Sequence, residues 1–333
     1  MAPSPVIGLS GRGFEALSLS RALARLGLPQ HWEGGPGADA PPASGLLPSN
    51  AVHALFALGL GPWLKRSALP LTHWQPPGAQ ALPLQSAGRS WRHGAPWYAV
   101  DPRALYRALV DAWIAEGVET APLGPKAPRL NLGAAGAVPR SLTWGEGPAR
   151  STAGPATVHF FRHAEGLITR LPLPEGRVRW EAPGMLGGEA LTAALAAEGY
   201  GEEVGRLTWH RAALTPAPPG DGDGALGPGL QDLPFWGGQR LAMALEDAWT
   251  AARFFDARPT DVALAGIAHH RSPRYARAEA QLTRLSAPPP ASLGKKTGSA
   301  ARRLLARLAP EWAQGQDDDL YGYDVRQRFG EGT

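Results

Sequence analysis

The sequence predicts an α/β protein that begins with a β-α-β unit of the nucleotide-binding type. Three observations lead to this prediction: a glycine-containing turn near the N-terminus, a middle stretch that alternates apolar and polar residues, and long helical patterns in the last third. The 333 residues, 44% hydrophobic and 19% charged, suffice for one large domain or two closely packed ones. These values describe a soluble globular chain rather than a disordered or membrane-spanning one.

The first thirty residues carry the β-α-β pattern. Residues 5–9 are expected to form a short buried strand, and residues 14–26 a helix that ends at Gly27. Residues 28–33 give a weaker second strand. The length of this unit is that of a nucleotide-binding half.

The turn inside this unit matches two of the three glycines of the GxGxxG pattern. Gly8 and Gly13 stand at the first and third positions, and Ser10 stands at the second. In this pattern the second glycine lets backbone N–H groups approach a pyrophosphate at the helix N-terminus. Glu33 follows about 20 positions after Gly13, the interval expected for an acid that binds a ribose hydroxyl. An ordinary strand–turn–helix explains a two-glycine match equally well, so the turn alone leaves nucleotide binding open.

The other elements follow from periodicity and capping residues. Helices are expected at 49–66, 101–117, 188–197, 237–256 and 267–285, antiparallel strands within 157–180, and a further strand at 207–214. Asp101 is predicted to cap its helix, with Pro102 in the first turn, and Ser49 or Asn50 to cap the helix before it. Residues 118–151 give a poor signal.

Composition excludes several classes of function. With no cysteine, the chain has no disulfide, thiolate zinc site or cysteine nucleophile. The net charge of +4 is not gathered into a stripe, and the basic cluster at 295–307 is expected to be a solvated helix face, so no nucleic-acid partner is predicted. No signal peptide or membrane span is recognised, which predicts a cytoplasmic protein. His269 and His270 lack a carboxylate at metal spacing and are expected to be surface or packed residues, so no metal is predicted.

Several motifs occur in the order found in one enzyme family. GLLPSNAVHALFALGLGPWL, VDPRALYRALV and LGAAGAVPRS are followed by GDGALGPGLQDLPFWGGQRLAMALEDA, residues 222–248. This series resembles the class A FAD-dependent aromatic hydroxylases, the p-hydroxybenzoate hydroxylase-like monooxygenases, over nearly the whole chain. The resemblance implies FAD-dependent hydroxylation or oxidation of a small, aromatic molecule, with NAD(P)H as a transient reductant and oxygen as co-substrate.

The resemblance also implies a domain organisation. A Rossmann-like FAD-binding domain is interrupted by a smaller β-rich substrate domain, and C-terminal helices follow. The FAD-binding domain comprises 1–70, 98–150 and 215–282, the substrate domain 71–97 and 151–214, and the linker, helix and tail 283–333. The expected partner is a small-molecule substrate, and the chain is a monomer or a homodimer.

Carried over position by position, the resemblance implies cofactor-binding roles for Gly8, Ser10, Gly13, Glu33, Arg103, Asp223, Gly238 and Arg240. In the family's pattern the glycine turn holds the pyrophosphate and the acid after the second strand binds the adenosine ribose. Asp223 is expected to accept a hydrogen bond from a hydroxyl on the flavin side, and Gly238 to open a helix N-terminus toward the cofactor. Phe235 and Trp236 would border the flavin ring, where substrate contact and plain packing are equally expected. No catalytic residue is assigned, and no GxSxG signature suggests a hydrolytic triad.

Five departures from the family pattern fall at the cofactor: Ser10, Pro102, Ala135, Leu226 and Arg240. Two lost charge-assisted hydrogen bonds and the crowding at Ser10 would together weaken FAD binding by about 5–8 kcal/mol. Arg240 could offset part of this loss by pairing with a phosphate. A cofactor-free homologue that acts as a binding or partner protein is therefore the alternative. A simpler NAD(P)-binding reductase is disfavoured, because it has no place for the ALEDA segment or the β-rich middle.

Overall fold

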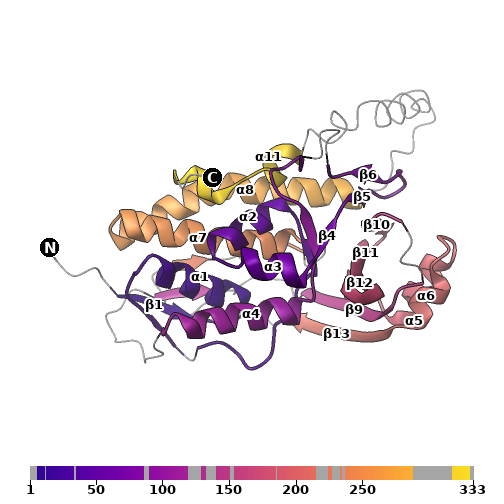
Figure 1. Cartoon of the computed structure of the whole chain (residues 1–333), viewed down its shortest axis with the longest axis horizontal. Coiled ribbons are helices and arrows are strands. Elements are labelled where there is room, and N and C mark those ends of the chain that lie inside the picture. The colour runs from indigo at the N-terminus through magenta and orange to yellow at the C-terminus, as the bar shows by residue number, and fades with distance from the viewer. Residues whose placement is uncertain are drawn as a thin grey trace.

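A computed structural model describes residues 6–11, 13–33, 35–85, 90–118, 129–132, 140–150, 154–184, 186–214, 224–226, 233–234, 237–287 and 317–330. The described residues form two adjoining lobes (Figure 1). One, here called the helical lobe, contains a small parallel sheet and most of the helices. The other, the sheet lobe, contains a large sheet with two short helices on its outer side.

The parallel sheet of the helical lobe has four strands in the order β14-β8-β1-β2. Their bounds are β1 (Ile7–Ser10), β2 (Gln30–Trp32), β8 (Arg129–Leu132) and β14 (Gly224–Leu226). All three pairings are parallel. The predicted β-α-β unit is confirmed, with α1 (Phe14–Arg25) joining β1 to β2.

Helix α1 packs between the sheet and the rest of the helical lobe because its apolar residues recur with helical spacing. Leu17 and Leu23 are fully buried, and each contributes about 1.5–3 kcal/mol through burial. The helix contacts α7 (Gln239–Ala257) most extensively and also α4 (Pro102–Ala115). Arg21, also buried, donates from Nε to the carbonyl of Leu58, at 2.8 Å, which ties α1 to the end of α2.

The single helix expected at 49–66 is instead two helices. Helix α2 (Ser49–Ala57) ends where Gly59 adopts a φ of 78°, and α3 (Gly61–Ser67) begins after this left-handed residue. The predicted cap was also wrong: Pro48 precedes the helix, and Ser49 donates its hydroxyl to the carbonyl of Ala95. The Asp101 cap of α4 is confirmed by its hydrogen bond from the Arg103 N–H, at 2.9 Å.

The sheet lobe contains a seven-stranded sheet in the order β13-β9-β12-β11-β10-β5-β6. Its strands are β5 (His73–Gln75), β6 (Leu82–Pro83), β9 (Arg140–Pro148), β10 (Thr157–His163), β11 (Gly166–Leu173), β12 (Arg177–Pro183) and β13 (Thr208–Leu214). The predicted strands within 157–180 are antiparallel, as expected. Strand β9, in a segment of poor sequence signal, pairs with β12 and β13 and so belongs to this sheet, not the parallel one.

Short elements complete the two lobes. A three-stranded sheet, β3 (Leu46–Leu47), β7 (Trp97–Ala99) and β4 (Leu69–Leu71), has the order β3-β7-β4. A 3-10 turn (Pro174–Gly176) joins β11 to β12, and α5 (Gly188–Ala196) and α6 (Gly201–Gly205) cover the outer side of the sheet lobe (Figure 1).

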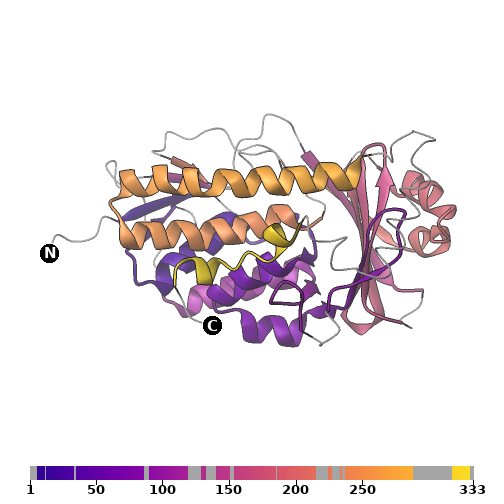
Figure 2. The same cartoon turned by 90° about the horizontal axis from the view of Figure 1, so that it is seen from above.

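Helices α7 and α8 (Thr260–Ser286) run side by side along the helical lobe, and α8 extends to the large sheet (Figure 2). The buried Glu246 and Asp247 of α7 bind Arg271 of α8, and Glu246 also binds Arg274. The acid pair of the ALEDA motif is therefore structural: it joins the two helices.

The C-terminal segment, residues 317–330, folds back onto this helix pair through α11 (Asp318–Tyr321) and α12 (Val325–Arg328). Arg274 donates to the carbonyls of Asp319 and Leu320, and the Leu320 side chain is buried. Among the described residues, no helix combines the length and apolar character needed to cross a membrane.

Candidate functional site

The turn after β1 lies at the carboxyl edge of the parallel sheet, where open α/β sheets bind ligands. Gly11 has a φ of 119°, a conformation that glycine adopts without strain. Helix α1 starts at Phe14, and within the described part of the chain no side chain caps its N-terminus. Its first backbone N–H groups are therefore available to an anion.

Ser10, which replaces the second glycine, is at the end of β1. Its hydroxyl lies 3.4 Å from the carbonyl oxygen of Leu130 in β8, to which it donates. The serine hydroxyl therefore has an acceptor within the sheet. The turn is further fixed by the buried Trp32, whose indole N–H donates to the Gly11 carbonyl at 2.9 Å.

Glu33 comes directly after β2, at the same edge of the sheet as the turn. Its N–H donates to the Leu9 carbonyl at 3.0 Å, and its side chain is exposed. The structure thus brings this carboxylate and the α1 N-terminus to one side of β1, which is the arrangement a nucleotide ribose and pyrophosphate need.

Glu15, a residue that the sequence reasoning missed, lies over this turn. A Cβ atom built on Gly13 would be 3.1 Å from its Oε2 atom and 3.9 Å from Cγ of Pro41. The half-buried carboxylate therefore lies against the N-terminus of α1, with the loop of residues 35–43 beside it. The available signal was an acidic residue in the first turn of the helix, where it interacts favourably with the helix dipole.

Gly238 begins α7 with a φ of 74°. A Cβ atom there would lie 2.5 Å from the carbonyl oxygen of Leu46 and 3.0 Å from Cδ of Pro48, so both backbone conformation and packing require glycine. The N-terminus of α7 also lacks a side-chain cap among the described residues. Arg240, two residues on, is buried and donates to the carbonyl of Leu233 at 2.8 Å. This contact turns the guanidinium toward the preceding loop and gives no support to the phosphate contact expected for it.

Three predicted site residues, Asp223, Phe235 and Trp236, lie outside the described residues, as does Ala135. Asp223 precedes β14 in the chain, and β14 runs parallel to β8 and β1. The end of β14 that meets the carboxyl edge of the sheet is therefore Leu226. The cofactor contact expected for Asp223 stays a prediction.

Arg103 lines a pocket of about 620 Å³ between the two lobes. This inter-lobe pocket is formed by residues 38–43, by Pro102, Arg103, Tyr106 and Arg107 of α4, and by Trp144, Arg179 and Ala212 of the large sheet. Tyr106 packs edge-on against Phe14 at 5.4 Å between ring centroids, and its hydroxyl donates to the Gly37 carbonyl. The pocket and the glycine turn therefore share one wall.

The arginines of this pocket differ in their partners. Arg179 is buried and held by Glu146 and Glu181, so its charge is neutralised. Arg103 and Arg107 are exposed on the first turns of α4, and neither pairs with an acid within the described residues. These two guanidinium groups, without an acidic partner among the described residues, favour an anionic or weakly acidic ligand. Among the described residues, no group of three or more His, Asp or Glu side chains could hold a metal ion.

Comparison with known proteins identifies the fold. No family model matches the sequence. No curated protein matches it either. Solved structures do match over nearly the whole chain, and the described architecture is that of the FAD-dependent monooxygenases, with a Rossmann-like domain and a large-sheet domain.

Three of the similar structures illustrate this likeness. A variant of Klebsiella pneumoniae HpxO complexed with FAD has a TM-score of 0.66 and 17% identity, covering 96% of this chain and 99% of that one. The 2-methyl-3-hydroxypyridine-5-carboxylic acid oxygenase has a TM-score of 0.64 and 15% identity, with coverages of 97% and 98%. Pseudomonas aeruginosa PqsL in complex with 2-aminobenzoylacetate has a TM-score of 0.63 and 16% identity, with coverages of 84% and 96%.

Proposed function

We propose that this chain is an FAD-dependent oxidoreductase of the monooxygenase type, which uses NAD(P)H and oxygen on a small aromatic or weakly acidic molecule. The observation that carries the proposal is the uncapped N-terminus of α1 beside Glu33, at the carboxyl edge of a parallel sheet. The same fold holds FAD in HpxO. In the cell we expect a cytoplasmic monomer or homodimer.

The residues of the turn fit the ADP half of FAD. The backbone N–H groups of Gly13 and Phe14 would bind the pyrophosphate, and the carboxylate of Glu33 would accept hydrogen bonds from the adenosine ribose. Among the described residues, the Glu15 carboxylate opposes this fit, and its flexible side chain can turn aside. When bound, the flavin supplies electron transfer from NAD(P)H and the reaction with oxygen, while the protein binds, orients and excludes water.

The inter-lobe pocket is the proposed site for the substrate. Its aromatic walls, Tyr106 and Trp144, suit a planar ring, and Arg103 and Arg107 suit an acidic group. The ligands of two similar structures have this character: one HpxO structure is complexed with uric acid, and one PqsL structure with 2-aminobenzoylacetate. We infer that Arg103 contacts either the substrate or a phosphate of the cofactor.

The test is the visible absorption spectrum of the purified protein before and after incubation with excess FAD, followed by gel filtration. Flavin bands that remain with the protein support the proposal. NAD(P)H oxidation is then measured with a panel of aromatic acids, for the wild type and for Arg103→Gln. We expect the affinity of the variant for the aromatic acid to be about tenfold lower, which is the effect of losing one charge-assisted hydrogen bond. Arg206→Gln, an exposed arginine on the sheet lobe, is the matched control.

The second candidate is a cofactor-free binding or partner protein. One observation favours it: the Glu15 carboxylate lies against the α1 N-terminus. A colourless protein that acquires no flavin bands with excess FAD would support this candidate and contradict the first.

A further inference from the structure

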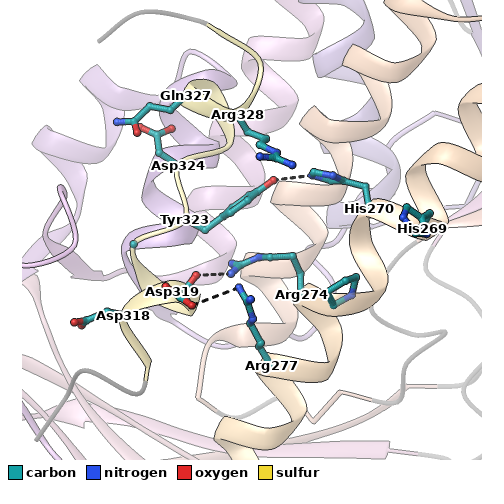
Figure 3. A pocket seen from close by; sticks show the side chains of 12 residues that line it. His269, His270, Arg274, Arg277, Asp318, Asp319, Tyr323, Asp324, Gln327 and Arg328 are labelled. Carbon is teal, nitrogen blue, oxygen red and sulfur yellow. Dashed lines mark hydrogen bonds and ion pairs between the residues drawn. The ribbon is translucent and has the colours of Figure 1, made fainter.

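A second pocket lies on the outer side of the helical lobe, between α8 and the C-terminal segment (Figure 3). Its volume is about 790 Å³, within the range of pockets that bind small molecules. His269, His270 and Arg277 line it from α8, and Tyr323 and Arg328 line it from the C-terminal segment. None of these residues belongs to the glycine turn or to the inter-lobe pocket.

Two of the three aspartates that line this C-terminal pocket, Asp318 and Asp324, have close arginine partners. Asp318 pairs with Arg92 at 2.8 Å, and Asp324 with Arg326 at 2.6 Å. The Asp319 carboxylate is 3.9 Å from Arg277, and both side chains are more than half exposed, so this contact leaves most of the charge on each group unneutralised.

The basic groups of the pocket have fewer acidic partners. The exposed Arg328 side chain makes no hydrogen bond or ion pair within the part of the chain that the structure describes. In Figure 3 its guanidinium points toward the Tyr323 hydroxyl and His270 rather than away from the protein. The exposed imidazole of His269 adds a further possible donor. The pocket therefore offers cationic and neutral donors that the protein itself does not satisfy.

The floor of the pocket is rigid. Tyr323 stacks on the guanidinium of Arg274, 4.1 Å from the ring centroid, and its hydroxyl lies 3.0 Å from Nε2 of His270. Arg274 is in turn held by the buried Glu246. Groups that are fixed before binding lose little freedom when a ligand arrives, which favours affinity.

We propose that the C-terminal pocket binds a phosphate-bearing small molecule, with Arg328 and Arg277 as its charged contacts. Guanidinium groups bind phosphate oxygens in pairs of parallel hydrogen bonds, and the exposed imidazole of His269, which also lines the pocket, supplies a further donor. The volume accommodates more than a single phosphate. This site is separate from the proposed cofactor site, because its residues lie on α8 and the C-terminal segment.

The probe is inorganic pyrophosphate, titrated into the full chain by isothermal calorimetry at low ionic strength. The titration is made with and without saturating FAD, because the glycine turn also binds anions. Arg328→Gln and Arg277→Gln are compared with Arg206→Gln, which changes an exposed arginine on the other lobe. Arg328→Gln removes no described contact, so it is expected to fold normally.

With saturating FAD present, we expect pyrophosphate to bind at one site per chain, with affinity weakened at least tenfold by Arg328→Gln and by Arg277→Gln and unchanged by Arg206→Gln. Three results would overturn the proposal. These are no measurable binding, equal weakening by all three substitutions, and loss of binding when FAD is added, which would assign the pyrophosphate to the glycine turn. The outcome does not depend on whether the chain binds FAD, so the two proposals fail separately.

Discussion

Removing the charge of Glu15 is predicted to strengthen FAD binding. Its carboxylate lies at the place where the N-terminus of α1 would meet a pyrophosphate, since Oε2 is 3.1 Å from the Cβ position of Gly13. Glu15→Gln keeps the size of the side chain and removes its charge. Two unit charges about 5 Å apart repel by about 3 kcal/mol at an effective dielectric constant of about 20, and by less than 1 kcal/mol in water.

Glu15 is half-buried, so we expect a repulsion of about 1–2 kcal/mol between these limits, equivalent to a 5- to 30-fold gain in FAD affinity. The substitution also removes a favourable interaction with the helix dipole, so the flavin-free variant should be less stable by about 0.3–1 kcal/mol. An increase in affinity together with a decrease in stability is the expected signature.

The assay is quenching of flavin fluorescence on titration of FAD with protein, at low and high salt, with urea unfolding of the flavin-free forms. Glu189→Gln is the control, because Glu189 is also an acid in the first turn of a helix but lies in the sheet lobe. Equal or weaker FAD binding by Glu15→Gln would refute the reasoning about this carboxylate. Failure of both forms to bind FAD would instead refute the proposed function.

Three further predictions concern stability, measured by urea unfolding. Gly238→Ala should lower the free energy of unfolding by at least about 1–3 kcal/mol, because φ is 74° and the added carbon meets a backbone oxygen; an unchanged midpoint would contradict this. Arg271→Gln should cost about 3–5 kcal/mol, because it leaves two buried carboxylates short of a partner, whereas Arg253→Gln, at a partly exposed position of α7, should have little effect. Burial, and then the nearby Arg170, lowers the pKa of His159 from 6.5 to about 4. The unfolded chain therefore binds this proton more readily, and the free energy of unfolding should decline as the pH falls from 6.5 to 4, less so in His159→Gln.

Local patterns predicted the elements that depend on local chemistry. The strand–turn–helix at the N-terminus and the Asp101 cap were found as expected, because apolar spacing and a capping side chain act within a few residues. The helix expected at 49–66 was not found as one helix, since Gly59 adopts a left-handed conformation. The packing of α2 against α3 requires this conformation. A glycine in a helical pattern does not reveal its φ.

The candidate site was harder to predict from the sequence, because its properties depend on strand order and side-chain direction. Only the parallel pairing of β14 with β8, for example, tells which end of β14 lies at the edge of the sheet that carries the glycine turn. Likewise, Glu15 is an ordinary first-turn acid in sequence terms, and its position over Gly13 becomes evident only in three dimensions.

Helix α8 has a mechanical consequence for the inter-lobe pocket. It packs on α7 within the helical lobe and reaches β10 and β11 of the other lobe, where Arg162 donates to the Leu285 carbonyl at 3.0 Å. Because α8 contacts both lobes, it resists rotation of one lobe against the other. Exchange of molecules with the pocket should therefore proceed by displacement of the short proline-containing loop at 35–43, which is held by the Tyr106 hydroxyl on the Gly37 carbonyl and by Arg179 on the Ala43 carbonyl. Because Arg179 holds the Ala43 end of the loop, the frequency at which the Tyr106 hydrogen bond opens would then set the rate of ligand entry.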